Sequence, residues 1–330
     1  MIVKGCYYFI SRYFQKNNIQ KINFIKIRGE ERMTRDKLDS PIKIGLLIVA
    51  LSWFLFTAYQ FLKGAFNIFR DYFWVSLTDT AGTLGMGFRT MAALIAVLTI
   101  LFYILKKDLK KPELFMSIRW MLLGEIIYFL SLIPVVIWGL AVVFGFESNI
   151  FGLGNFVEST LPVMIEAIGI PIVLTKLFLE LNPDKPARGA IKWGLISGVL
   201  YVFVFWINNS GNWMGAITRN GIEYVTAYPD HIFSFGLTSI GLLALALYGV
   251  YIIRKSWDAN SLSELDIRKI GVLITGVGLY FVVNYVMWLF LGTDSKWSTW
   301  YAWFLGHNAE LWMISLPLVG VPLLFKRNSK

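Results

Sequence analysis

The chain has very few of the side chains on which disulfides, metal sites and redox centres depend. Its 330 residues include one cysteine, Cys6, and two histidines, His231 and His307. A single cysteine excludes an internal disulfide and any CxxC motif. Two histidines limit the haem or metal sites that the chain could build from its own side chains.

Charged residues are also scarce. They make up 16% of the chain, against 56% hydrophobic residues. A soluble protein of this length would need a larger polar surface, so the composition excludes two soluble domains joined by a linker. The net charge of +10 does not point to nucleic acid as a partner. The basic residues flank apolar runs, as they do when they set membrane topology.

The apolar residues are grouped in runs of about 20, the length at which an α-helix crosses the hydrocarbon layer. No barrel-type alternation separates these runs, so we expect an all-α fold, a polytopic transmembrane bundle of about eight helices. The expected spans cover residues 44–62, 83–105, 116–145, 160–182, 190–208, 231–253, 270–292 and 302–325. Pro134 lies inside the third span and predicts a kink or tilt there.

Lysine and arginine are distributed unevenly between the two sets of connections. With the N-terminus inside, 25 of the 31 basic residues fall on the inner side and 5 on the outer side, Arg89 among the latter. Cytoplasmic loops of membrane proteins carry such an excess. The count predicts a multi-pass protein of the plasma membrane, in contact with the lipid bilayer and with both termini in the cytoplasm.

The domain organisation follows from the same pattern. Residues 1–42 form a basic cytoplasmic segment, residues 43–326 the transmembrane domain and residues 327–330 a cytoplasmic tail. The basic segment either lies on the anionic inner leaflet or precedes the true start. We favour the second interpretation, because Met33–Lys37 is typical of a cytoplasmic start before a first helix.

Ionisable residues inside the spans are the first candidates for function, because charge in the bilayer is costly. Glu125, Glu166 and Glu310 lie in the third, fourth and eighth spans. Lys176 and Glu180 lie one turn apart in the fourth. The last two could form a structural ion pair or be two snorkelling side chains. Alternatively, Glu125, Glu166, Lys176 and Glu310 could line a proton or ion path.

The two histidines lie at the outer level of the membrane, where each could bind a metal or be a hydrogen-bonded interfacial residue. His307 begins the eighth span, and Glu310 follows one turn later, where it could orient the imidazole as a haem or copper ligand. His231 opens the sixth span. Alternatively, Asp230 and His231 simply cap that helix.

Four segments of the chain resemble subunit I of the haem–copper terminal oxidases, particularly the short archaeal and thermophile type. They are Tyr228-Pro229, the aromatic segment 297–304, Gly306-His307 and Ser315-Leu316-Pro317. In that family a Tyr-Pro-Pro element precedes the fourth core helix. A Gly-His pair opens the sixth helix, and this histidine binds the active-site copper. The resemblance covers about residues 116–325, the counterpart of the family's first six helices.

The chain departs from this family at most of the ligand positions. Asp230 replaces the second proline, Leu311 stands where the family has a tyrosine, and the low-spin haem histidine would fall near Pro162 or Val163. Only His307 survives as a matching ligand. The resemblance therefore implies a membrane subunit of a respiratory terminal-oxidase-like complex that is not catalytic alone. Haem or copper would bind only with ligands from a partner chain, such as another oxidase subunit.

The alternative function is a secondary transporter or channel that uses an intramembrane Glu/Lys path. A third class is an assembly or scaffold protein without a site.

Overall fold

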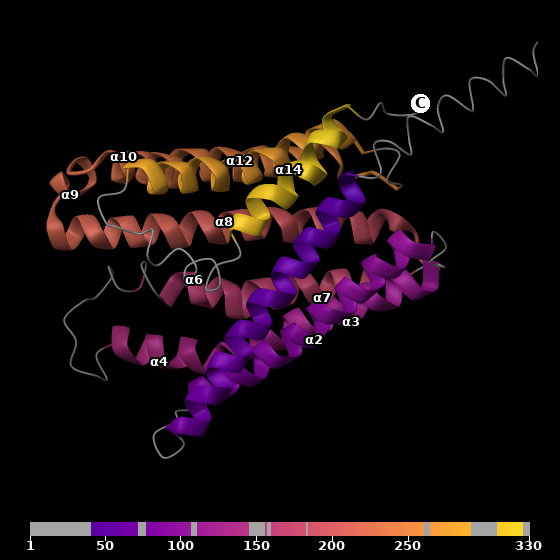
Figure 1. The fold of residues 1–330 in the computed structure, drawn as a ribbon, viewed down its shortest axis with the longest axis horizontal. Coiled ribbons are helices and arrows are strands. Elements are labelled where there is room, and N and C mark those ends of the chain that lie inside the picture. Colours follow the sequence, from indigo (N-terminus) through magenta and orange to yellow (C-terminus); the bar gives the residue numbers. More distant parts are fainter. Residues whose placement is uncertain are drawn as a thin grey trace, which may run out of the picture.

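The computed structural model describes eight stretches of the chain. They are residues 41–71, 77–106, 111–144, 156, 160–182, 184–260, 265–291 and 309–325. Within these stretches the regular structure is entirely helical and no residue lies in a strand (Figure 1). The all-α fold predicted from the sequence is therefore confirmed. The N-terminal segment up to residue 40, with Met33, and the tail 327–330 lie outside the described residues.

Six helical segments in the described part of the chain are long and apolar enough to cross a membrane. They are Pro41–Arg70, Asp79–Phe102, Phe115–Val143, Leu161–Glu180, Ala187–Asn220 and His231–Lys255. The protein is therefore a multi-pass membrane protein that contacts the lipid bilayer. Two further helices, α12 (Ile267–Leu291) and α14 (Ala309–Phe325), occupy the places of the expected seventh and eighth spans. The total of about eight crossings and their orientation stay predictions.

Two spans are longer than the sequence predicts. The first helix runs over Pro41–Arg70 instead of 44–62. Helix α8 runs without a break over Ala187–Asn220. The expected fifth span ended at residue 208. That boundary is wrong: the polar stretch continues the helix, and Asn209 Nδ2 donates to the carbonyl of Phe205 one turn back at 2.9 Å.

The third span is divided at the place where Pro134 predicts a kink. Helix α3 (Lys111–Leu130) ends before Ser131, and α4 (Ile133–Val143) begins with proline in its first turn. Proline has no N–H and cannot continue the hydrogen-bond ladder. Ser131 closes the end of α3 instead, because its hydroxyl donates to the carbonyl of Tyr128 at 2.6 Å. The predicted kink is confirmed.

The fourth and sixth spans each contain one turn of π-helix. Segment η2 (Ile165–Gly169) separates α6 (Leu161–Met164) from α7 (Ile170–Glu180). Segment η3 (Leu237–Gly241) separates α10 (Pro229–Gly236) from α11 (Leu242–Lys255). A short helix, α9 (Glu223–Thr226), precedes α10. Single π turns inside α-helices occur frequently at functional sites.

Helices α2 (Leu77–Lys106) and α3 pack closely because small residues face each other. A Cβ atom at Gly124 would stand 2.5 Å from the Cβ of Ala92 and 2.9 Å from the carbonyl oxygen of Phe88. Ala93 is fully buried beside this contact. Small residues let transmembrane backbones approach, which compensates for the absence of a hydrophobic driving force in lipid.

Helices α12 and α14 are joined by a similar contact, in which a Cβ at Gly271 would stand 3.0 Å from the carbonyl oxygen of Gly320.

In Figure 1 helices α12 and α14, together with α8, form one side of the molecule, whereas α2, α3 and α4 form the other. The first helix crosses the bundle obliquely (indigo in Figure 1). Between the two sides, α3, α7 and α8 share a hydrophobic core that includes Leu122, Ile170 and Val204.

Candidate functional site

An ion pair lies inside the membrane-spanning part of the bundle. Arg89 on α2 donates from Nε to Oε1 of Glu125 on α3 at 2.6 Å. The two side chains are only 17% and 5% exposed. A charge at this depth is costly in lipid and needs a partner. The pair therefore stabilises each member, and its two residues come from helices that also pack through glycine and alanine.

Aromatic rings surround the guanidinium of Arg89. Its Cζ lies 4.5 Å from the ring centroid of Tyr128, 5.7 Å from that of Phe129 and 5.8 Å from that of Trp53 on the first helix. Cations are attracted to the faces of such rings, most strongly where water is excluded. These contacts hold Arg89 in place beside Glu125, whose Oε1 accepts a hydrogen bond from it.

Two further ionisable groups belong to the same site. Glu166, on η2, is half-buried and lies within the electrostatic reach of Arg89. Tyr201, on α8, is reached by the charges of Arg89, Glu125 and Glu166. We call Arg89, Glu125, Tyr128, Glu166 and Tyr201 the polar cluster. It draws one or two side chains from each of four helical segments.

The polar cluster occupies one level of the bundle. Glu125 and Tyr201 each lie 14 residues from the first residue of their helices, and Glu166 lies 14 residues from the end of α7. At 1.5 Å per residue these positions are about 21 Å from the helix ends that the sequence assigns to the cytoplasm. Arg89, 17 residues from the end of α2, lies at about 26 Å. The cluster therefore lies at similar depths inside the spans, well away from their cytoplasmic ends.

The π turn at Glu166 leaves a backbone carbonyl without a helical donor. The N–H of Ile170 donates to the carbonyl of Ile165, not to that of Glu166. The next residue, Pro171, has no N–H. The sequence thus explains the local geometry: proline removes the donor that would continue the α-helical ladder. Glu166 consequently presents both a carboxyl group and a carbonyl oxygen at the same level of the helix.

The carboxyl of Glu125 also has an unused acceptor. Its Oε2 atom is buried and has no hydrogen-bond partner in the structure, although Oε1 is paired with Arg89. A buried carboxylate oxygen without a partner is costly. One guanidinium also balances only one of the two carboxylates. The cluster can reach charge balance by taking up one monovalent cation, a proton or a metal ion such as Na⁺.

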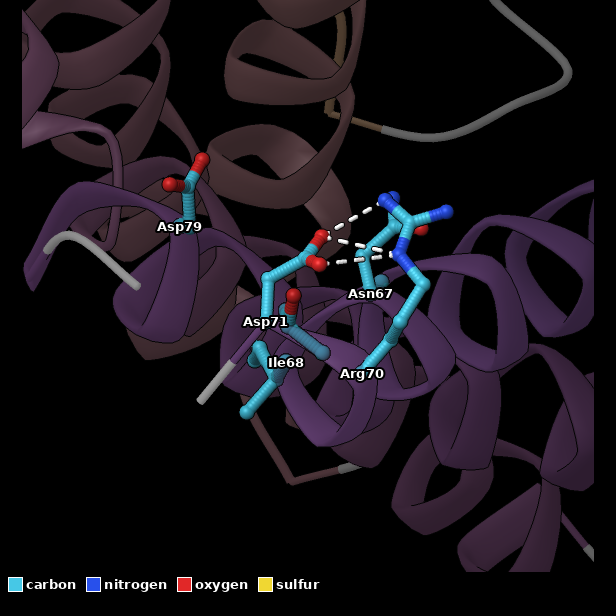
Figure 2. Close-up of a pocket in the computed structure, with 7 residues that line it drawn as sticks. Asn67, Ile68, Arg70, Asp71 and Asp79 are labelled. Carbon is cyan, nitrogen blue, oxygen red and sulfur yellow. Dashed lines mark hydrogen bonds and ion pairs between the residues drawn. The ribbon is translucent and has the colours of Figure 1, made fainter. Parts of the chain in front are cut away.

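A polar recess lies at the ends of the first helix and α2, nearer to the outer side in the predicted topology. It encloses about 400 Å³ and is lined by Asn67, Arg70, Asp71, Asp79 and Thr83, among others. Figure 2 shows the carboxylate of Asp71 turned toward the guanidinium of Arg70, to which it is bound by three hydrogen bonds of 2.6–3.0 Å. This hydrogen-bonded guanidinium lowers the pKa of the Asp71 carboxyl.

The recess and the polar cluster both include residues of α2. Thr83 lines the recess and precedes Arg89 on α2 by six residues, or about 9 Å along the axis. Ser131, the residue directly after α3, packs against α2 between these two levels: a Cβ at Gly85 would meet its hydroxyl.

The predicted path residues are only partly brought together. Glu125 and Glu166 are both members of the polar cluster, but Lys176 is not: it is exposed, near the opposite end of α7. The expected ion pair between Lys176 and Glu180 is also absent, although both residues are described. The ion-pair alternative is therefore wrong, whereas the alternative of two snorkelling side chains stays a prediction. Lys176 extends outward, whereas Glu180 lies against α8, where a Cβ at Gly189 would meet its carboxylate.

His231 lies in a group of aromatic rings. The centroids of Tyr224, Tyr228 and Trp213 are 4.7, 5.0 and 5.4 Å from that of the imidazole. Its Nδ1 lies 2.9 Å from the carbonyl oxygen of Tyr224, which can only accept, so Nδ1 carries the proton. Asp230 is not the cap residue, because α10 begins at Pro229 and Tyr228 holds that position. Within the described part of the chain, no group of three or more His, Cys, Asp or Glu residues could hold a metal ion.

The remaining candidates fall where the structure gives no side-chain geometry. His307 lies outside the described residues. Glu310 is the second residue of α14, but its side chain lies outside the description. Their proposed roles as copper ligand and path residue therefore stay predictions.

Three members of the polar cluster, Arg89, Tyr128 and Tyr201, were not predicted from the sequence. Arg89 was counted with the outer basic residues, although it lies inside the expected span 83–105. It is in fact buried in α2. A single arginine in an otherwise apolar run was the signal that could have identified it. Tyr128 and Tyr201 carried no such signal, because tyrosine is common in transmembrane helices.

Comparison with known proteins does not assign the chain to a family: no protein-family model, no curated protein and no solved structure matches it.

Proposed function

We propose that the protein is a secondary transporter coupled to a monovalent cation that binds in the polar cluster. The single observation that carries this proposal is the charge balance of the cluster. Arg89 pairs with Glu125, and among the described residues no cation forms an ion pair with Glu166. A proton or Na⁺ at Glu166 would neutralise the site, and its release would restore the charge. Such reversible charging is the chemistry that coupling requires.

The interrupted fourth and sixth spans support this proposal. Secondary transporters commonly place their ion sites where transmembrane helices are broken, because freed backbone carbonyls can coordinate the ion. Glu166 lies in such a break and offers its carbonyl. The second interruption, η3, lies in the sixth span. Two broken helices in one bundle also provide places where the helices could bend between inward-facing and outward-facing states.

We further propose that the cation enters from the recess formed by Asn67, Asp71, Asp79 and Thr83. In the topology that the Lys and Arg distribution favours, this recess is extracellular and both termini are in the cytoplasm. The plasma membrane is the location that fits a coupled transporter, because a cation gradient is maintained across it.

Purified protein in liposomes tests the function directly. In one arm, pyranine inside the vesicles reports proton entry under a K⁺–valinomycin potential. In the other, uptake of ²²Na⁺ reports sodium exchange. We expect one arm to exceed empty liposomes. Glu166→Gln should reduce that flux to the level of empty liposomes, whereas Glu180→Gln, on the same helix but outside the cluster, should leave it unchanged.

Cation binding provides a second readout that does not depend on the transported solute. A ligand at 100 times its Kd stabilises the folded state by about 2.7 kcal/mol. Replacing choline in the buffer by Na⁺, or lowering the pH, should therefore raise the Tm of the wild type and of Glu180→Gln. The Tm of Glu166→Gln should not change. A wild type without flux in either arm and without a cation-dependent Tm would refute the proposal.

The other function that the sequence favours, a non-catalytic subunit of a terminal-oxidase-like complex, depends on His307. It makes a separate prediction. The complex isolated from its native membrane with its partners should show Soret absorbance or bound copper. Membranes in which the complex shows neither would exclude that function.

A further inference from the structure

A second cavity is lined by Tyr201, which also belongs to the polar cluster. It encloses about 270 Å³ between the first helix, α8, α11, α12 and α14. Val49, Gly198, Phe205, Phe281 and Leu316 contribute to its wall. None of these five residues belongs to the polar cluster, so the cavity is a separate feature of the bundle.

The wall of this cavity is almost purely hydrocarbon. Of all its lining residues only Tyr201 carries a polar side-chain atom, and the others are valine, leucine, isoleucine, phenylalanine and glycine. Such a wall provides no hydrogen-bond partner for a charged or polar ligand. A polar ligand would lose its hydrogen bonds to water on entering the cavity, which is energetically unfavourable. The chemistry therefore selects an aliphatic group.

The position of the cavity identifies the source of that group. Gly198 and Phe205 lie 11 and 18 residues into α8, which is about 16 and 27 Å along the helix. This interval falls within the hydrocarbon layer. Gly198 is exposed, so the cavity reaches the surface of the bundle there. The surrounding medium at this depth consists of lipid chains.

We propose that this cavity is a binding site for one hydrocarbon chain of a bilayer lipid. The chain enters beside Gly198 and packs against Phe205, Phe281 and Leu316. Gly198 is the entrance because a Cβ placed there would meet no atom within 4 Å. A larger side chain at this position therefore occupies the space of the lipid chain without displacing protein atoms.

The site adjoins the polar cluster through one residue. The ring of Tyr201 lines the cavity, and the same residue is reached by the charges of Arg89, Glu125 and Glu166. A chain in the cavity would fix this ring and so alter cation affinity. This last consequence rests on the proposed transport function, whereas the lipid site itself does not.

The test is photocrosslinking in nanodiscs that contain a phosphatidylcholine with a diazirine in the middle of one acyl chain. Labelled residues are then identified by mass spectrometry. In the wild type we expect labelling of the wall residues at positions 202, 205 and 277 above that of lipid-exposed Ile240 on η3. Gly198→Leu should reduce the wall labelling at least fivefold.

Gly194→Leu is the matched control. A Cβ at Gly194 also meets no atom within 4 Å, but this residue does not line the cavity. Its wall labelling should equal that of the wild type. Equal labelling in Gly198→Leu and the wild type would overturn the proposal, as would wall labelling below that of Ile240. If Gly198→Leu does not fold, Gly198→Val provides the smaller filling residue.

Discussion

The ion pair between Arg89 and Glu125 permits a quantitative test of the buried site. We consider Arg89→Met and Glu125→Leu, which replace each partner by an apolar side chain of similar volume. The pair joins side chains that are 17% and 5% exposed at 2.6 Å. Two unit charges about 4 Å apart attract by ~4 kcal/mol at an effective dielectric constant of ~20.

Each single variant should be strongly destabilised, because it leaves one charged group buried without its partner. Removal of one member of such a pair costs about 3–5 kcal/mol. The double variant Arg89→Met/Glu125→Leu leaves neither charge and should lose less than either single variant. We therefore expect the two single effects to be non-additive by ~3 kcal/mol or more.

The measurement is a double-mutant cycle of unfolding free energies, from equilibrium unfolding in mixed micelles of SDS and a mild detergent. Replacement of Arg70, whose ion pair with Asp71 is exposed, supplies a control, because Arg70→Met should change the unfolding free energy little. If the single effects of Arg89→Met and Glu125→Leu simply add in the double variant, within about 0.5 kcal/mol, the two residues are not coupled. The description of the polar cluster would then be wrong.

Three further predictions concern packing, pH and topology. Gly124→Leu should destabilise the protein by at least about 1–3 kcal/mol, because its Cβ would meet α2, whereas Gly236→Leu, with no atom within 4 Å of a Cβ, should be nearly neutral in the same unfolding assay. The pKa of Asp71 is lowered by Arg70, so their ion pair is complete at neutral pH and is lost as pH falls through that pKa. In Arg70→Gln the pKa of Asp71, measured by ¹³C NMR of its carboxyl, should rise toward ~3.9. On intact cells and in a Cys6→Ser background, a membrane-impermeant maleimide should label Asn67→Cys but not Lys255→Cys, and the reverse pattern would contradict the predicted topology.

The sequence predicted the helices well because their formation depends on local properties. Long apolar runs define the spans in lipid irrespective of tertiary contacts. Pro134 predicted the division between α3 and α4 because proline acts on its own helix. The end of α8 was missed for the same local reason: Asn208 and Gly211 are poor helix formers. Within the bundle, they nevertheless continue the helix to Asn220.

The candidate site was only half predictable. Glu125 and Glu166 stood out because charge is rare in a span. Their relation to Arg89 depends on how α2, α3 and η2 pack, and no spacing within one helix contains that information. The reverse error affected Lys176 and Glu180, whose one-turn spacing suggested a pair. Their side chains lie in different environments, one exposed and one against α8.

The length of α8 has a mechanical consequence. Its 34 residues extend over about 51 Å, whereas the hydrocarbon layer is about 30 Å thick. Even a tilt of 40°, the upper end of the range for transmembrane helices, leaves it crossing about 39 Å. The helix must therefore stand out of the hydrocarbon layer, with Trp213 in its protruding section. The helix is unbroken (Figure 1), so a displacement of its protruding end would tilt the whole helix. Tyr201 and Gly198 would then move together, because both lie on it.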